Sequence, residues 1–373
     1  MKITQRETAR QIMNFDVVLL GAILSLASLG LVMVLSASGI MAEKVYGDKY
    51  ALFWKQVLFM VAGFAVLIFA SRANMSFFYR NTYTWLALAA GLLILTIFSP
   101  FSTTAGGASR WLRLGPFSVQ PLEAAKIALV FYLSYFFANK QELIKTFSVG
   151  FLPPIIMTGA LCFLLLLQPD FGGAVFLSAL LFLMCLVGGT RIIFLASAGM
   201  LGLVSAVLLV VNSPYRFRRV FSFLDPFKDA QNSGYQLVQS LYGLGSGGWF
   251  GQGLGEGKQK LFFLPEAHND FIMSVIGEEL GFVGISLIVI LIGVVLWRAI
   301  LISIRQESMH DRITAFGMGA ILVIGSLLNM GVVMGAIPPK GVPMPFISYG
   351  GSHLVAGFFC AGVLLNLSRK VKA

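Results

Sequence analysis

Long apolar runs are the feature that most constrains how this chain can fold. A helix needs about 20 apolar residues to cross the hydrocarbon core of a bilayer. With 57% hydrophobic and 12% charged residues, the composition also differs from that of a soluble globular domain. We therefore expect an all-α polytopic membrane protein, built as one domain over residues 1–373. Its ten expected spans lie near residues 16–38, 52–70, 82–98, 121–138, 150–168, 171–188, 191–211, 271–297, 313–336 and 351–368.

The distribution of Lys and Arg predicts how the spans are oriented. With a cytoplasmic N-terminus, fourteen of the 27 basic residues flank the inner ends of the spans, and the short outer loops hold five. Basic residues in short loops stay on the cytoplasmic side, so we expect both termini inside and the long loop 212–269 outside the cytoplasm. These flanks and anionic lipid groups account for the net charge of +11 without nucleic acid. The first span is too long for a signal-peptide core and is expected to remain uncleaved.

A glycine-rich, polar passage at residues 247–281 leads into the eighth span, and Asp270 lies at the point of entry. An acid beside hydrocarbon is unfavourable and usually has a task, so we expect Asp270 to be the reactive centre. Segment 337–352 contains four prolines and three glycines and cannot be a continuous helix. Non-helical backbone at membrane depth lines a cavity or is buried by protein. We expect this segment to line the same cavity as Asp270, and residues 106–120 to lie along the interface.

Other charged side chains near the spans have structural as well as functional interpretations. Glu123 and Lys126 are three residues apart and share a helix face, so they either form an internal ion pair or bind a polar substrate. Glu278 and Glu279 lie about two turns beyond Asp270, and a buried network with neighbouring helices is favoured for them over a part in catalysis.

Two residues in outer turns have weaker functional signals. Asp170 directly follows a Gln-Pro pair and is expected to be a turn carboxylate or a helix cap. His268 is a single ring without the ligand spacing of a metal site, so zinc is not expected there.

Short motifs spread in order over most of the chain carry a resemblance to a known family. They are Arg110-Trp111, Leu114-Gly115-Pro116, Gln120-Pro121 to Lys126, Gln168 to Gly172, Tyr215-Arg216 with Arg219, Asp225-Pro226, Gly247-Gly248-Trp249, Gly253-Leu254-Gly255, Leu264 to Phe271, Gly277 to Gly281 and Lys340-Gly341 to Ser352. Together with the expected spans, these motifs resemble the SEDS family of bacterial cell-wall proteins (shape, elongation, division and sporulation).

Within that family the sequence is more similar to the division-type members than to the elongation-type members. The residues that carry this distinction are Pro265 to His268 and Lys340-Gly341. An elongation-type polymerase is the near alternative. The sequence departs from the family pattern at Ser109, Leu122, Asn269 and His353.

The resemblance implies a peptidoglycan glycosyltransferase that polymerises lipid II into a lipid-linked growing glycan at the outer face of the bacterial cytoplasmic membrane. It also implies a class B penicillin-binding protein as transpeptidase partner, other divisome proteins, and a place at the division septum. The family has its essential acid at the position matching Asp270. It has important polar residues at those matching Arg110, Glu123 and Lys126.

The chemistry of this reaction assigns roles to the candidate residues. Asp270 would act as general base on the acceptor hydroxyl, and cations would stabilise the diphosphate that leaves. Because diphosphate is a good leaving group, a second carboxylate acting as acid is not required. No cofactor or metal site is specified, although a divalent cation, Mg or Mn, would be able to share the diphosphate. The expected substrate-binding residues are Arg110, Glu123, Lys126, Arg216, Lys258, Lys260, Lys340, Ser348, Tyr349 and Gly350.

Two further functions are compatible with the residues themselves. Charged residues inside spans also mark substrate paths, so Glu123 and Lys126 are compatible with a transporter, or flippase, of lipid-linked cell-wall precursor. A scaffold that only recruits partners is the third alternative. The spacing of the residues alone supports an enzyme and a transporter about equally, and the family resemblance favours the enzyme.

Overall fold

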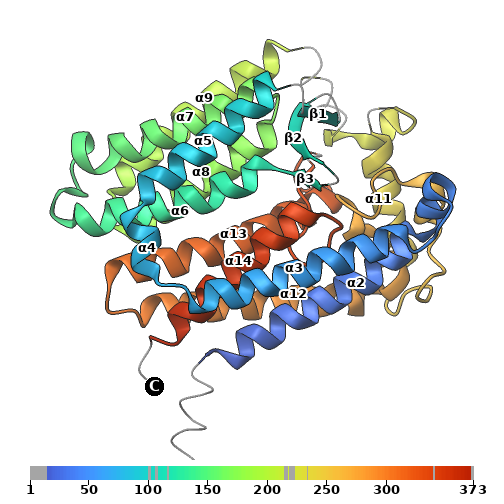
Figure 1. The fold of residues 1–373 in the computed structure, drawn as a ribbon. Helices are drawn as coiled ribbons and strands as arrows, with labels where there is room; N and C mark the ends of the chain where they lie inside the picture. Colours follow the sequence, from blue (N-terminus) through green and yellow to red (C-terminus); the bar gives the residue numbers. More distant parts are fainter. Residues whose placement is uncertain are drawn as a thin grey trace, which may run out of the picture.

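The computed structural model describes residues 15–99, 102–105, 108–115, 117–213, 217, 223–232, 234–338 and 341–370. Long helices dominate this part of the chain and lie side by side (Figure 1). They are α2 (Val17–Tyr46), α3 (Ala51–Arg72), α5 (Thr82–Phe98), α6 (Pro121–Asn139), α7 (Leu152–Leu167), α8 (Phe171–Gly188), α9 (Ile192–Val211), α12 (Ile272–Ile304), α13 (Met309–Val333) and α14 (Gly351–Ser368).

The all-α polytopic class expected from the sequence is confirmed. Eight helices in the described part of the chain are long and apolar enough to cross a membrane, and the apolar stretches Thr82–Phe98 and Ile192–Ser205 are shorter. Each of the ten ranges expected from hydropathy overlaps one of the long helices. Helix α2 continues to Tyr46 rather than ending near residue 38, because its backbone stays helical until Gly47, whose φ of 73° forms a left-handed cap.

The long helices form two groups (Figure 1). Helices α5 to α9 make up one group, and α2, α3, α12, α13 and α14 make up the other. The groups meet where α6 and α8 pack against α13, while α14 lies along α3. Phe131 of α6, Phe176 of α8 and Phe358 of α14 are buried at 2% exposure or less. The ring of Phe78, from the short helix α4 (Met75–Arg80), stacks on Phe131 with centroids 5.0 Å apart.

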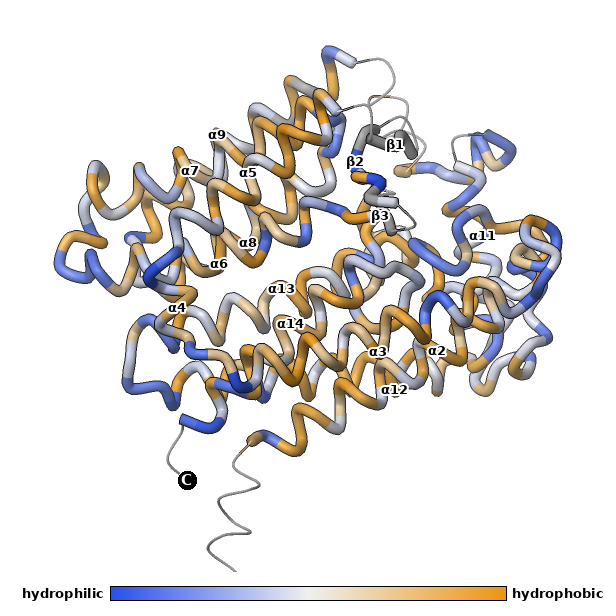
Figure 2. Tube along the Cα trace, in the orientation of Figure 1, coloured by the Kyte–Doolittle hydropathy of each residue, from blue (hydrophilic) through white to orange (hydrophobic). Residues whose placement is uncertain are grey.

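One end of the molecule carries the shorter elements, and we call it the loop end. Residues expected to lie along the interface form an antiparallel sheet there, in the order β1-β2-β3, with Leu112 paired to Ser102 and to Val119. Hydrophilic residues gather in this region, while hydrophobic residues cover most of the long helices (Figure 2). The shorter elements are β1 (Ser102–Ala105), β2 (Ala108–Leu114), β3 (Phe117–Val119), η3 (Pro226–Asp229), α11 (Tyr235–Ser246) and η4 (Gln259–Phe263); η1 (Gln141–Leu143) and η2 (Phe147–Phe151) lie between α6 and α7.

The opposite end joins the beginning and the end of the described chain. Asp16 caps α2 by accepting from the backbone N–H of Leu19. Its carboxylate also pairs with Nη2 of Arg298 at 2.6 Å, and its backbone N–H donates to Ser368 Oγ at 3.1 Å. The first and last long helices therefore meet at the end remote from the loop end.

Candidate functional site

Asp270 lies at the loop end, just before α12, and its surroundings come from three segments distant in sequence. Its backbone carbonyl accepts from Asn329 Nδ2 of α13 at 2.8 Å, and the same amide donates to the carbonyl of Val342 at 2.8 Å. A polar side chain inside an apolar span therefore holds the entry of α12 against the segment that begins at Gly341.

Further hydrogen bonds fix the non-helical segment 341–350 to the residues before α12. Ser348 Oγ donates to the carbonyl of Asn269 at 2.7 Å, and the backbone N–H of Tyr349 donates to the carbonyl of His268 at 3.0 Å. Gln56 of α3 holds the same segment from the other side, through the carbonyl of Ser348 and the N–H of Gly350. Ser348, Tyr349 and Gly350 thus contribute mainly backbone contacts and a structural hydroxyl.

Gly341 is the point of closest approach between this segment and the acid. A Cβ atom at Gly341 would lie 2.9 Å from Asp270 Oδ2 and 3.7 Å from Arg110 Nη1. The missing side chain therefore leaves room for the carboxylate and the guanidinium to approach the same place. Arg110 comes from β2, and its Nε lies 3.3 Å from Asp170 Oδ1 with a quarter of its side chain exposed. The guanidinium is held in position and remains accessible.

The environment of Asp270 changes its acidity. Burial and, to a smaller extent, the nearby Glu266 carboxylate raise the pKa of Asp270, Arg110 opposes both effects, and the resulting pKa is about 7. Burial also lowers the pKa of the His268 imidazole, which favours its neutral form. A carboxyl group that titrates near neutrality is suited to accepting and returning a proton.

A small cavity lies beside Gly341, between the first turns of three helices. It is lined by Glu123 and Lys126 of α6, Asp170 at the start of α8, Gly341, and His353 of α14, among others. Lys126 Nζ is 2.7 Å from Glu123 Oε2 and 4.6 Å from the Phe176 ring centroid. The ion pair considered for these two residues is therefore present, and its charges balance.

The same cavity receives the N-termini of α6, α8 and α14. Unsatisfied backbone N–H groups and the helix dipole make such ends favourable for negative charge. Asp170 uses this property by accepting from the N–H of Gly173 at 3.1 Å, which caps α8. Its second role, the contact with Arg110, was not considered from the sequence.

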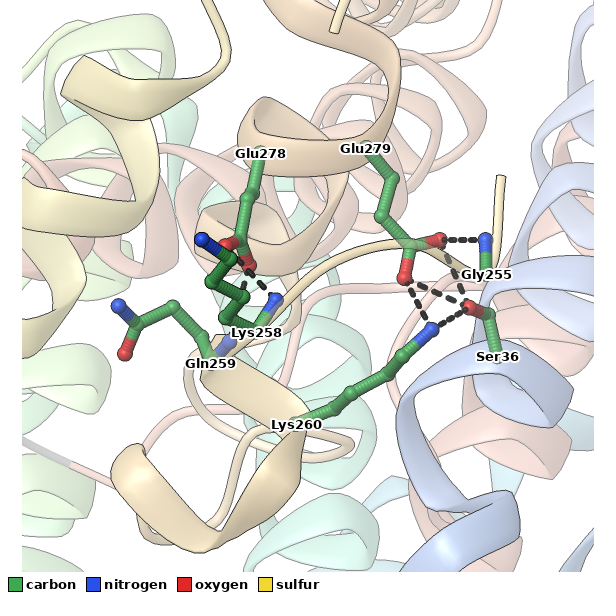
Figure 3. A network of polar contacts seen from close by, with 7 residues as sticks. All are labelled: Ser36, Gly255, Lys258, Gln259, Lys260, Glu278 and Glu279. Atoms are coloured by element: carbon green, nitrogen blue, oxygen red, sulfur yellow. Dashed lines mark hydrogen bonds and ion pairs between the residues drawn. The ribbon is translucent and has the colours of Figure 1, made fainter. Parts of the chain in front are cut away.

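The acids of α12 belong to a different network, shown in Figure 3. Glu278 accepts from the backbone N–H of Lys258 at 2.8 Å and of Gln259 at 3.1 Å. Glu279 accepts from Lys260 Nζ at 2.7 Å and from Ser36 Oγ of α2 at 2.7 Å. Both carboxylates attach the long loop to the helix bundle.

This network changes the interpretation of two residues expected to bind substrate. The Lys260 ammonium is buried and paired with Glu279, because the loop folds back onto α12, so the structure does not bring it together with Asp270. Lys258 is exposed, and its described contact is through its backbone. Arg216 and Lys340, also expected to bind substrate, lie outside the described residues.

Sequence reasoning did not assign roles to Asn329, Glu266, Gln56 or His353. Asn329 and Gln56 are polar residues in apolar spans, and this feature of the sequence could have identified them as candidates for a structural or functional role. Glu266 acts on Asp270 through its charge, and His353 was noted only as a departure from the family pattern. Among the described residues, no group of three His, Cys, Asp or Glu side chains lies together to hold a metal, so we derive no step through a divalent cation.

Comparison with known proteins identifies the family. The model of a family described as "Cell cycle protein", which groups FtsW, RodA and SpoVE, matches residues 17–373. This chain belongs to that family. The resemblance to SEDS proteins is thereby confirmed, and the chain is a membrane protein of this family.

The relatives extend over the full length of the chain. It is 42% identical to the probable peptidoglycan glycosyltransferase FtsW of Trichlorobacter lovleyi, over 96% of this chain and 94% of the relative. It is 37% identical to the stage V sporulation protein E of Bacillus subtilis, over 95% and 97% of the two chains. Several FtsW proteins among the relatives agree with the division-type features of the sequence.

Solved structures share the fold. A chain from a study of how a peptidoglycan synthase complex coordinates polymerization and crosslinking superimposes with a TM-score of 0.79 at 26% identity, covering 96% of this chain and 98% of that chain. The rod shape determining protein RodA of Thermus thermophilus superimposes with a TM-score of 0.71 at 25% identity, covering 97% and 99%.

Proposed function

We propose that this protein is a peptidoglycan glycosyltransferase that polymerises lipid II at the outer face of the cytoplasmic membrane, for septal wall synthesis in cell division. Membership of the family and the names of its full-length relatives support the activity. The observation that carries the assignment of the site is the Asp270 carboxyl, with a pKa of about 7, opposite the accessible Arg110 guanidinium across Gly341.

Asp270 acts as the general base. Its carboxylate takes the proton of the acceptor sugar's 4-hydroxyl while that oxygen attacks the anomeric carbon of the donor. The bond between the anomeric carbon and the diphosphate oxygen breaks, and its electron pair leaves with the lipid diphosphate. Positioned bases of suitable pKa contribute about 10²- to 10⁴-fold to such steps.

Arg110 and the helix N-termini stabilise the leaving diphosphate. Charge-assisted bonds from a guanidinium to phosphate oxygens are among the stronger hydrogen bonds, and preorganised donors act best where charge develops. The Asp170 carboxylate, 3.3 Å from Arg110 Nε, orients the guanidinium. The N-termini of α6, α8 and α14, at the small cavity beside Gly341, add positive potential from a distance without contacting the diphosphate.

The partner and the membrane orientation are part of the same proposal. A class B penicillin-binding protein would crosslink the strands made here, and the similar chain from a peptidoglycan synthase complex supports this pairing. Other divisome proteins would locate the pair at the septum. The loop end faces outward, where lipid II is polymerised, and both termini are cytoplasmic.

Reconstitution with labelled lipid II tests the activity. The full-length chain, alone and with its transpeptidase partner, is placed in liposomes, and glycan length and movement of label between leaflets are measured together. We expect strands to lengthen in at least the partner-containing sample. Movement of labelled lipid without lengthening would instead indicate a transporter, and neither effect would indicate a scaffold.

A further inference from the structure

His353 and Gln120, which both line the cavity beside Gly341, each have a buried polar atom without a partner among the described residues. Both side chains line this cavity, and they are 5% and 7% exposed. Among the described residues, neither His353 Nε2 nor Gln120 Oε1 has a hydrogen-bond partner. Buried polar atoms usually have a partner, so two such atoms in one cavity are available to bind a ligand or a water.

The other ring nitrogen of His353 determines what Nε2 can do. Nδ1 lies 3.2 Å from Glu123 Oε1. An ionised carboxylate only accepts, so Nδ1 carries a hydrogen, which leaves Nε2 as an acceptor in the neutral form of the ring. The negative charge of Glu123 is already balanced by Lys126 at 2.7 Å. With the ring in this form, the cavity presents two acceptors, Nε2 and the amide oxygen of Gln120.

Size and position restrict the ligand further. The cavity measures about 20 Å³, enough for a single oxygen with its hydrogens and too small for a phosphate group. Ionised phosphate oxygens would also face two acceptors and gain no hydrogen bond. Gly341 lines the cavity and adjoins Asp270 Oδ2 and Arg110, so a ligand here is continuous with the proposed reaction site.

We propose that this cavity is a subsite for a sugar hydroxyl of the lipid-linked substrate, which donates to His353 Nε2 or Gln120 Oε1. The proposal rests on the glycosyltransferase function proposed above and deepens it. Glu123, with Lys126, acts on the subsite through His353 by fixing its tautomer and orientation. The two acceptors then discriminate substrates that carry this hydroxyl from those that lack it.

Equilibrium binding to a variant that does not turn over separates this proposal from the reaction itself. The full-length chain carrying Asp270→Asn is titrated with a lipid-linked disaccharide diphosphate and, separately, with the same lipid diphosphate without sugar. Adding His353→Asn keeps an amide donor near Glu123 but removes the acceptor in the cavity. We expect about fivefold weaker binding of the disaccharide ligand, the size of one hydrogen bond, and unchanged binding of the sugar-free ligand.

Three further variants sharpen the comparison. His353→Gln returns a polar atom near the place of Nε2 and should recover most of the affinity. Gln120→Met removes the second acceptor at similar volume and should reproduce the sugar-dependent loss, even if His353→Asn fails to fold. His310→Asn, at the start of α13 and remote from the loop end, is the matched control and should have no effect.

The outcomes are distinguishable. If His353→Asn and Gln120→Met both bind the disaccharide ligand as tightly as the parent Asp270→Asn chain, the subsite is overturned and the cavity holds only a resident water. Equal weakening for both ligands would assign the cavity to the diphosphate and also overturn the proposal. If the chain with Asp270 intact polymerises no lipid II while the sugar-dependent difference remains, the proposed function fails and the subsite stands.

Discussion

At the scale of single residues, Asp270 differs from four other buried acids in how its charge is matched. Glu123, Glu279, Asp16 and Asp311 each have a Lys or Arg nitrogen within 2.9 Å. Among the described residues, no Lys or Arg side chain makes such a contact with the Asp270 carboxylate. A close cation balances the charge of an acid, whereas burial without such a contact raises the pKa of Asp270 and suits it to proton transfer.

The pKa of Asp270 leads to a prediction about pH dependence. A general base works when ionised, so kcat/KM for lipid II should rise about tenfold per pH unit on the acid side and level off above about 7. Because Glu266 raises the pKa of Asp270, Glu266→Gln should lower it and shift the midpoint to lower pH. Glu256→Gln, an exposed acid of the same loop, is the control. A midpoint that moves equally in both variants, or in neither, would contradict this assignment.

Local spacing determined which residue contacts could be predicted. Glu123 and Lys126 share one helix face, so their pairing followed from the sequence. Arg110 and Asp170 are brought together by β2 and the turn before α8, and no periodic pattern encodes that meeting. Lys260 was expected to bind substrate because the leaving diphosphate requires cations. Only the folded path of the loop shows that its ammonium lies against Glu279.

At the scale of elements, the long loop is joined to α12 where that helix is interrupted. Gly281 has a φ of 66° inside α12, and a Cβ there would lie 2.3 Å from the backbone N of Gly251. Next to this interruption, the N–H of Phe282 donates to the carbonyl of Gly248 and that of Gln252 donates to the carbonyl of Glu278. The side chains of Glu278 and Glu279 extend the attachment to residues 255–260, as Figure 3 shows.

This attachment predicts that replacing one buried carboxylate by an amide strongly lowers the stability of the protein. Glu279→Gln leaves the Lys260 ammonium buried without its counter-charge, which should destabilise the protein by about 3 kcal/mol. Thermal unfolding in detergent and proteolysis within residues 251–263 should both report the loss, and Glu279→Gln with Lys260→Met should recover part of it.

The exposed pair of Asp225 and Lys228 supplies the control for that prediction. Its two side chains are 47% and 83% exposed, and surface pairs contribute about 1 kcal/mol or less. Asp225→Asn should therefore change neither the unfolding midpoint nor the cleavage pattern. Equal behaviour of Glu279→Gln and Asp225→Asn would show that the buried pair does not hold the loop.

Elements outside the apolar runs were harder to predict than the helices. Hydropathy indicated the helices because each long run has one physical solution in a bilayer. The sheet β1-β2-β3 was not predicted from the sequence. Its strands are short, mix polar and apolar residues without regular alternation, and pair only with their neighbours in sequence. The end of α2 was placed near residue 38 instead of Tyr46, because a criterion based on bilayer thickness does not detect a helix that continues beyond that length.

At the scale of the whole molecule, the two ends have different tasks. The loop end brings together β2, the start of α8, segment 341–350 and the entry of α12 around Asp270. The opposite end joins the beginning of α2, α12 and the end of α14 through Asp16, Arg298 and Ser368. Lys and Arg counts predict which end faces the cytoplasm. The hydropathy of a single segment does not show which helices it will contact. The packing of α14 along α3 is therefore known only from the structure.

Cysteine labelling tests the proposed orientation. Lys228→Cys, at the loop end, should react with a membrane-impermeant maleimide on intact spheroplasts, because its side chain is 83% exposed. Glu142→Cys, exposed between α6 and α7, should react only after permeabilisation. The unmodified chain, whose cysteines are Cys162, Cys185 and Cys360, gives the background. Labelling in the reverse order would place Asp270 on the wrong side for lipid II.

Polymerisation of lipid II by Asp270→Asn tests the central claim most directly. The amide keeps the shape of the side chain but cannot take a proton, so the purified variant should bind lipid II with nearly wild-type affinity. Its rate of glycan elongation should fall by at least about 100-fold, with an unchanged unfolding midpoint. Elongation by Asp270→Asn within a few-fold of the wild-type rate would contradict the account.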